Sequence, residues 1–156
     1  MSQWTHVIGT IQCSWTEEDA IELLGKPVLW SDTDDLEYGT PEYDSYYENV
    51  WRPAFDNFAK GKGIPMGSEG SVDWYFVKTK DQNCLGEGSL IAIQGDLRDF
   101  GGEKDIQGII DWFVNAAKHA RFATLIIKDE YSDEYVHIVA DWGHIMIAKY
   151  TSGEDE

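Results

Sequence analysis

Hydrophobic and polar residues alternate in several short segments of the chain, and in two other segments the hydrophobic residues recur three and four positions apart. Alternation among β-branched residues predicts strands, whereas the longer spacing predicts amphipathic helices. We expect strands at residues 5–13, 72–79, 89–96, 122–128, 134–140 and 145–150. We expect helices at residues 16–24 and 105–119.

The first expected helix has recognisable ends. Thr16 and the three acids after it resemble a capping box, in which the Thr side chain and an acid three residues later each bond to the backbone. Gly25 and Pro27 follow where a helix typically ends. The apolar stripe of the second helix consists of Ile106, Ile109, Ile110, Phe113, Val114 and Ala117.

The order of the elements is β-α-β-β-α-β, followed by one or two extra strands at the C-terminal end. This order predicts an α+β protein of the ferredoxin-like split βαβ type, with an antiparallel sheet and two helices on one face. Residues 1–150 are expected to form a single domain, and residues 151–156 a frayed acidic tail. The fold hosts many unrelated activities, so it does not decide function.

Residues 31–66, after the first helix, fit neither pattern. Prolines at positions 41, 53 and 65 interrupt them, and a short helix around residues 50–60 is compatible with the sequence. A structureless connection of this length is unusual inside a compact domain and is usually functional or an insertion. We therefore interpret the segment as an acidic, aromatic insertion.

Composition excludes several classes of protein. Of the 156 residues, 42% are hydrophobic and 13% aromatic, which argues against a disordered chain. No apolar run approaches the roughly 20 residues of a membrane-spanning helix, and the first residues do not resemble a signal peptide. Cys13 and Cys84 are too few for a disulfide framework, so we expect a cytoplasmic protein in which both are ordinary buried residues.

The formal charge of −17 is unevenly distributed along the chain. Residues 16–48 hold 11 acids and one base, and residues 129–156 hold eight acids and one base. Residues 49–128 hold ten acids and ten bases, so they balance. Because Lys and Arg carry phosphate binding, the acidic excess argues against nucleic acid as a direct partner.

The acids of the insertion are interleaved with tyrosines. Tyrosine is enriched at protein interfaces, and carboxylates can stand in for phosphates when the partner is a nucleic-acid-binding protein. The insertion is therefore a candidate site through which a non-enzymatic protein engages a basic protein surface. Its candidate residues are Asp32, Asp34, Asp35, Glu37, Tyr38, Glu42, Tyr43, Asp44, Tyr46, Tyr47 and Glu48.

Two other interpretations of the insertion remain open. It could be a solvated acidic loop whose tyrosines pack back on the sheet. It could also bind calcium, since Asp32, Asp34, Asp35 and Glu37 supply oxygen ligands, although the Gly and terminal Glu of an EF-hand loop are missing.

A rival site lies in two glycine-containing segments. Gly67, Ser68, Gly70 and Ser71 resemble a turn whose amides cradle an anion, and Arg98 has the planar donor fork that suits a small anionic ligand such as a nucleotide. Either a binding protein or an enzyme could use such a site. The turn lacks the Lys and the following helix of a nucleotide-binding loop. The simpler interpretation is that Arg98 pairs with its neighbouring acids and fixes the turn before the second helix.

No catalytic residue, cofactor or metal is assigned, and an enzyme is not favoured. The chain has no Gly-x-Ser-x-Gly, P-loop, HExxH or CxxC motif. A zinc site from His137, His144 and Asp141 is conceivable, but ordinary core or edge histidines are the simpler interpretation.

Three short motifs are Trp4-Thr5-His6-Val7-Ile8-Gly9, Gly67-Ser68-Glu69-Gly70-Ser71 and Gly95-Asp96-Leu97-Arg98-Asp99-Phe100. They look like motifs of small uncharacterised acidic proteins encoded by bacteriophages and prophages, and the resemblance covers most of the chain outside the insertion. It implies the cytoplasm of a bacterial host and a partner such as a host defence or nucleic-acid-binding protein, which the phage protein inhibits. It implies no catalytic residues. A structural or assembly component of a phage particle is a further alternative.

Overall fold

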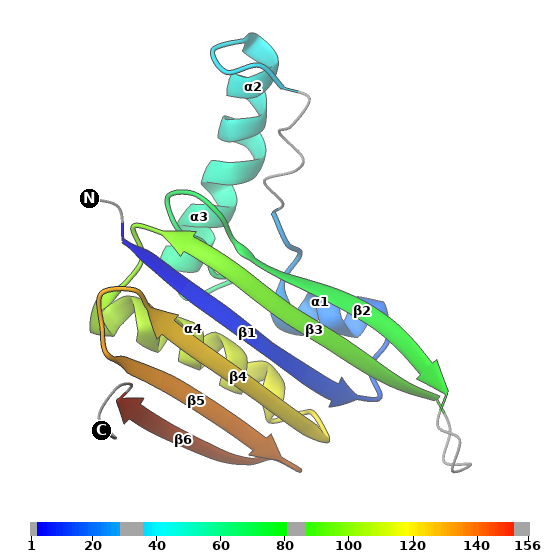
Figure 1. Ribbon diagram of the computed structural model, residues 1–156. Helices are drawn as coiled ribbons and strands as arrows, with labels where there is room; N and C mark the ends of the chain where they lie inside the picture. The colour runs from blue at the N-terminus through cyan, green and yellow to red at the C-terminus, as the bar shows by residue number, and fades with distance from the viewer. Residues whose placement is uncertain (1–2, 29–35, 81–86, 152–156) are drawn as a thin grey trace.

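An antiparallel six-stranded sheet, in the order β2-β3-β1-β4-β5-β6, forms the body of the protein (Figure 1). The computed structural model describes residues 3–28, 36–80 and 87–151. The strands are β1 (Trp4–Cys13), β2 (Val72–Lys80), β3 (Glu87–Arg98), β4 (Phe122–Asp129), β5 (Glu134–Asp141) and β6 (His144–Thr151).

Two helices, α1 (Glu17–Leu24) and α4 (Gly102–Ala117), cover one face of this sheet (Figure 1). All the strands and both helices predicted from the alternation and helical spacing are confirmed, with ends shifted by at most three residues. The protein is therefore an α+β protein. Thr151 belongs to the last strand rather than to the expected tail, because it pairs with Glu134.

The sheet has a buried and an open face because side chains alternate along each strand. In β1, Val7 and Ile11 are buried against the helices, whereas Ile8 between them is 63% exposed on the opposite side. The same alternation in β2 buries Trp74 and exposes Tyr75. We call the side without helices the outer face.

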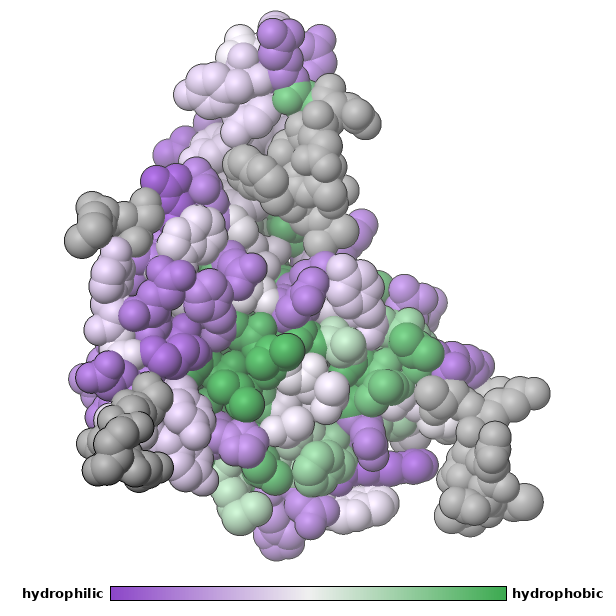
Figure 2. All heavy atoms as spheres, in the orientation of Figure 1, coloured by the Kyte–Doolittle hydropathy of each residue, from purple (hydrophilic) through white to green (hydrophobic). Residues whose placement is uncertain are grey.

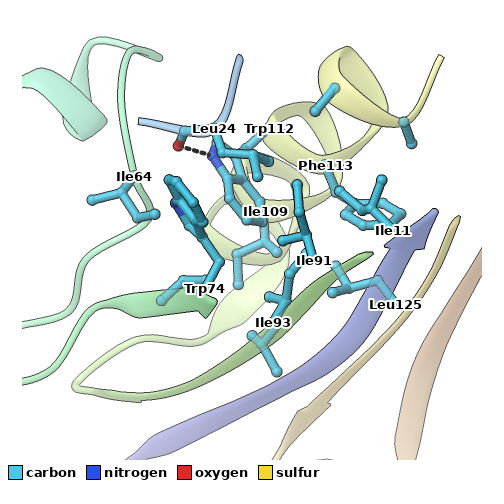
Figure 3. Close-up of a cluster of buried hydrophobic side chains, with 14 of the residues drawn as sticks. Ile11, Leu24, Ile64, Trp74, Ile91, Ile93, Ile109, Trp112, Phe113 and Leu125 are labelled. Carbon is cyan, nitrogen blue, oxygen red and sulfur yellow. Dashed lines mark hydrogen bonds between the residues drawn. The ribbon is translucent and has the colours of Figure 1, made fainter. Parts of the chain in front are cut away.

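Two tryptophans fix the C-terminal end of α1 in the core (Figure 3). The last carbonyls of a helix lack partners within the helix. Trp112 Nε1 of α4 donates to the Leu24 carbonyl oxygen (2.8 Å), and Trp74 Nε1 of β2 donates to the Gly25 carbonyl oxygen (2.8 Å). The first bond supplies a donor to a buried carbonyl, and the second supplies one to a partly buried carbonyl just past the helix.

The ends of α1 are those that the sequence predicts. Thr16 Oγ1 accepts from the Asp19 amide (3.1 Å), and Asp19 Oδ2 accepts from the Thr16 amide (3.0 Å), so the capping box is complete. Gly25 ends the helix with φ of 87°, a left-handed value that favours glycine.

The insertion is more regular than the sequence predicts. It forms α2 (Pro41–Tyr46), the π-helical segment η2 (Tyr47–Trp51) and α3 (Arg52–Ala59), which together make one helical arm that stands away from the sheet (Figure 1). Prolines signal interruption in a sequence, but Pro41 lies in the first turn of α2, where a missing N–H costs little. Pro53 comes just after η2, so its missing N–H falls where the helical hydrogen bonding already departs from the α pattern. The short helix expected around residues 50–60 therefore corresponds to α3, which is the second half of the arm.

None of the helices in the described part of the chain is long and apolar enough to cross a membrane.

Candidate functional site

The helical arm (residues 41–59) is anchored at its base and free along its outer half. Trp51 is buried in the core, and Ala54 and Phe58 pack against the core from the same side of the arm. α2 has no fully buried residue, and Tyr46 at its C-terminal end packs partly against the core. The arm therefore presents its N-terminal half to solvent while α3 holds it against the body.

The acids of the arm point into solvent. Glu37, Glu42, Asp44 and Glu48 are all exposed. Glu48 Oε1 lies 3.3 Å from Arg52 Nη1, and within the described chain no cation pairs with Glu42 or Asp44. Asp32, Asp34 and Asp35, which belong to the predicted site and to the calcium alternative, lie outside the described residues.

The tyrosines of the arm divide between solvent and core. Tyr38 is 85% exposed and stands edge-on to Tyr43, with 5.3 Å between the ring centroids. Tyr47 is also exposed, whereas Tyr46 packs partly against the core. Tyr38 and Tyr47 are thus available to a partner, and Tyr46 has the structural role that the solvated-loop interpretation predicts.

Folding gathers further acids at the end of the sheet where the arm is attached (Figure 1). Pairing of β1 with β3 and β4 places His6 opposite Asp96, and Thr5 opposite Asp129. Glu103, at the start of α4, lines the same hollow as Asp129. We call this region the acidic end; its acids are Asp96, Asp99, Glu103, Asp105, Asp129, Glu130, Asp133 and Glu134.

The sequence could not reveal the acidic end because its members come from both the balanced middle of the chain and the acidic C-terminal segment. Asp96 of β3 and Glu130 of the turn after β4, for example, are both brought to one histidine of β1. Only the strand register, which is a tertiary property, makes them neighbours. The hydropathy pattern predicts the strands themselves but not which charges meet at their ends.

His6 ties the acidic end together. Its Nδ1 lies 2.5 Å from Asp96 Oδ1, and its Nε2 lies 3.0 Å from Glu130 Oε1. The hydrogen bond to Asp96, followed by that to Glu130, raises the pKa of His6 above its ordinary value of 6.5. Two carboxylates thus favour the imidazolium, and both ring nitrogens are engaged, so His6 offers no free lone pair for a general base.

The glycine turn at residues 67–71 is brought next to Arg98, and protein groups accept hydrogen bonds from two of its amides and from the Arg98 guanidinium. Arg98 Nη1 lies 2.5 Å from Glu69 Oε1. The Gly67 amide donates to the Gly70 carbonyl (3.0 Å), and the Ser68 amide donates to the Arg98 carbonyl (2.9 Å). These contacts fix the glycine turn to the end of β3. Of the neighbouring acids that the simpler interpretation pairs with Arg98, Asp99 has its Oδ2 3.9 Å from Arg98 Nε, farther away than Glu69.

The last residue of the turn also has an internal partner. Ser71 Oγ donates to the Val28 carbonyl oxygen at 2.7 Å. Gly70 has φ of 79°, and a β-carbon there would run into the Asp96 carbonyl oxygen. The turn is therefore a tightly packed connection into β2, in which glycine is needed for close backbone approach.

The histidines and cysteines of the described chain are not arranged for metal chemistry. His137 Nε2 lies 2.9 Å from Thr124 Oγ1, and His144 lies opposite Asp141 in the register of β5 and β6. Within the described ranges, no group of three or more His, Cys, Asp or Glu side chains is placed to hold a metal ion. Cys13 is buried, and burial raises the pKa of its thiol. Cys84 lies outside the described residues.

The outer face of the sheet is apolar over much of its area (Figure 2). Large hydrophobic side chains project from it without a described helix to cover them. They are Ile8, Tyr75, Val77, Phe122, Ile126, Met146 and Tyr150. Large apolar patches of this kind mark interaction surfaces in soluble proteins.

Comparison of the chain with protein-family models, curated proteins and solved structures found no match. Function has to be inferred from the surfaces described above.

Proposed function

We propose that the protein is a non-enzymatic acidic binding protein that engages a basic surface of another protein through its helical arm. The observation that carries the proposal is the arm itself. It stands off the sheet, has no fully buried residue in α2, and exposes Glu42, Asp44 and Tyr47, with exposed Tyr38 just before it. A core element would hide its tyrosines, and a solvated loop would have no need of a helix anchored by Trp51.

Charge and tyrosine have different roles in this proposal. Exposed carboxylates steer a basic partner toward the arm and increase the association rate, an effect that falls with ionic strength. Tyrosine adds contact area at low entropic cost. A surface that combines both can imitate nucleic acid, and the partner we favour is a host defence or nucleic-acid-binding protein that a phage-encoded inhibitor blocks. The bacterial cytoplasm is the compartment that this role requires.

We also propose that the first four strands, with α1 and α4, form a ferredoxin-like split βαβ unit. The order β2-β3-β1-β4, antiparallel throughout, supports this assignment because two βαβ-type crossovers leave both helices on one face. On this view β5 and β6 extend the unit past β4, as the two extra C-terminal strands.

A small-anion site at the glycine turn has less support. Arg98 pairs with Glu69, and the amides of Gly67 and Ser68 donate to carbonyl groups. A ligand would have to displace these contacts, at a cost of roughly 1 kcal/mol for each hydrogen bond.

The apolar outer face favours one further candidate, an assembly component of a phage particle. Exposed Ile8, Phe122 and Met146 would be covered if copies of the chain associate through this face. Sizing by light scattering tests it, since a defined oligomer is expected. A monomer at high protein concentration contradicts it.

The arm proposal is tested by capture from a bacterial lysate at low and high salt. The bait variant Glu42→Gln, Asp44→Asn, Glu48→Gln removes three arm charges, and Glu17→Gln, Glu18→Gln, Glu22→Gln removes three from α1 as the matched control. We expect wild type and the control to capture a basic protein that high salt releases, and the arm variant to lose it. Capture that the arm variant retains would contradict the proposal.

A further inference from the structure

A groove of about 740 Å³ lies between the arm and α4. Its apolar side chains are Phe55 and Phe58 from α3, Met66 before the glycine turn, and Phe100 after β3. Phe58 and Phe100 stack with 5.8 Å between their ring centroids, and Phe55 is 39% exposed. The groove therefore has an aromatic wall that remains open to solvent.

The rim of this groove is acidic. Asp99, Glu103, Asp105 and Asp111 line it, and among the described lining residues Lys104 is the only base. Asp99 accepts from Ser68 Oγ (2.8 Å), and Asp105 from the Gly101 amide (3.2 Å).

Two of these rim acids, Glu103 and Asp111, are free to meet a cation. Asp111 accepts only a neutral hydrogen bond, from Gln107 Nε2 (2.8 Å). Neither Asp111 nor Glu103 is paired with a cation in the described part of the chain. Both are exposed. A cationic group could thus reach these two carboxylates without breaking an existing ion pair.

A glycine in the middle of α4 shapes the bottom of the groove. A β-carbon at Gly108 would lie 3.3 Å from Phe58 Cζ, which is closer than ordinary van der Waals contact. Glycine in a helix interior costs about 1 kcal/mol relative to alanine. The cost is offset here because the absence of a side chain lets the Phe58 ring lie against the helix and leaves space beside it.

We propose that this groove binds a basic apolar segment of the partner protein, in which an aliphatic or aromatic side chain lies next to an arginine. This inference rests on the proposed function and identifies what the partner presents. The aromatic wall requires an apolar side chain, since its burial supplies roughly 25 cal/mol for each Å². The rim favours a cation and disfavours phosphates, because four acids face one base among its described lining residues, and Glu103 and Asp111 have no cationic partner in the described chain.

Arginine suits this groove better than lysine does. Its flat guanidinium can stack on the exposed ring of Phe55 while its donor fork reaches a carboxylate such as Glu103. The arm and the groove then have separate roles. The arm attracts a basic partner through long-range electrostatic interactions. The groove binds one short segment of that partner through direct contacts.

The test uses the full chain and a fluorescein-labelled peptide of alternating arginine and leucine, with binding followed by fluorescence anisotropy. Two control peptides replace either every arginine by glutamine or every leucine by serine. We expect the arginine–leucine peptide to bind at least about tenfold more tightly than either control, because cation and apolar side chain are both needed. If the arginine–serine peptide binds equally well, the interaction is general charge attraction, and the proposal is overturned.

Matched variants locate the site. Phe55→Ala removes part of the aromatic wall, and Phe122→Ala removes an equally exposed ring, 39%, from the outer face of the sheet. Glu103→Gln with Asp111→Asn removes two rim charges, and Glu18→Gln with Glu22→Gln removes two from α1. We expect the groove variants to weaken peptide binding about three- to tenfold and the controls to change it less than about twofold. Equal losses in groove and control variants would overturn the groove as the site.

Circular dichroism and thermal melting show that each variant is folded before its affinity is compared. The two hypotheses fail differently. If groove variants retain wild-type peptide affinity while arm variants lose the captured partner, the groove inference is wrong and the arm proposal stands. If the arm variant captures the partner as wild type does, the proposed function fails, whatever the groove binds.

Discussion

The ring of Phe58 lies against the backbone of Gly108, so close that a β-carbon on that glycine would sit 3.3 Å from Phe58 Cζ. This contact joins the arm to α4, and the stack of Phe58 on Phe100 continues it to the end of β3. Together with buried Trp51, it fixes the base of the arm to the body of the protein. The direction in which the arm projects is therefore a consequence of side-chain packing.

Replacing Gly108 by Leu should destabilise the protein. The new side chain would occupy the place of the Phe58 ring, and the overpacking cost of about 1–3 kcal/mol exceeds the gain of about 1 kcal/mol in helix propensity. Urea unfolding measures the difference. Asn115→Leu, at an exposed position of the same helix, serves as the control and should have little effect. Equal stability of Gly108→Leu and wild type would show that the arm does not depend on this contact.

The hydrogen bond from Trp112 Nε1 to the buried Leu24 carbonyl oxygen should stabilise the fold, because it gives that oxygen its donor. Trp112→Phe keeps most of the apolar ring but leaves the Leu24 oxygen without its donor. We expect a loss of about 1–3 kcal/mol in the free energy of unfolding. Trp142→Phe is the matched control, because Trp142 is 73% exposed and should change stability little. Similar losses for both variants would contradict this role of the indole N–H.

The His6 cluster should make stability depend on pH in a defined direction. The folded-state pKa of His6 is raised by Asp96 and Glu130, so the stabilisation is fully present below the unfolded value near 6.5. It is lost as the pH rises through the folded pKa. Because the groups are partly exposed, the effect should be at most about 1 kcal/mol.

The measurement for His6 compares wild type with His6→Gln by urea unfolding across mildly acidic to mildly alkaline pH. The stability advantage of wild type should shrink as the pH rises. A difference between the two proteins that stays constant, or grows with pH, would show that the imidazolium does not bridge the two carboxylates in solution.

Arg98 should hold the glycine turn against the end of β3 rather than bind an anionic ligand. Arg98→Ala removes the ion pair with Glu69, and we expect faster exchange of the Ser68 amide, which donates to the Arg98 carbonyl. Nucleotides should not raise the melting temperature of wild type more than that of the variant. A nucleotide-induced shift that disappears in Arg98→Ala would support the anion-binding alternative instead.

Hydropathy alone predicts most of the body of this protein. Alternation in segments such as Val72–Lys80, with Trp74 inward and Tyr75 outward, follows directly from the two-residue period of a strand. The capping box at Thr16 and the left-handed Gly25 are equally local. These features depend on neighbours in sequence, which is why they are readable without the structure.

The arm and the groove depend on tertiary contacts and are less predictable. Prolines obscured the helices of the arm, although the Thr40 side chain before Pro41 is an N-cap signal that could have indicated the first of them. The groove residues Phe55, Glu103 and Asp111 carry no local signal for a site. Gly108, inside a strongly amphipathic helix, is the one sequence feature that points to a close approach.

The central claim, that the acidic arm engages a basic partner, is tested most directly by titrating the captured partner against wild type and the arm variant over a range of salt concentrations. We predict that the triple substitution at Glu42, Asp44 and Glu48 weakens binding about tenfold at low salt and flattens its salt dependence, while the triple α1 control follows wild type. An arm variant with wild-type affinity and wild-type salt dependence would contradict the account.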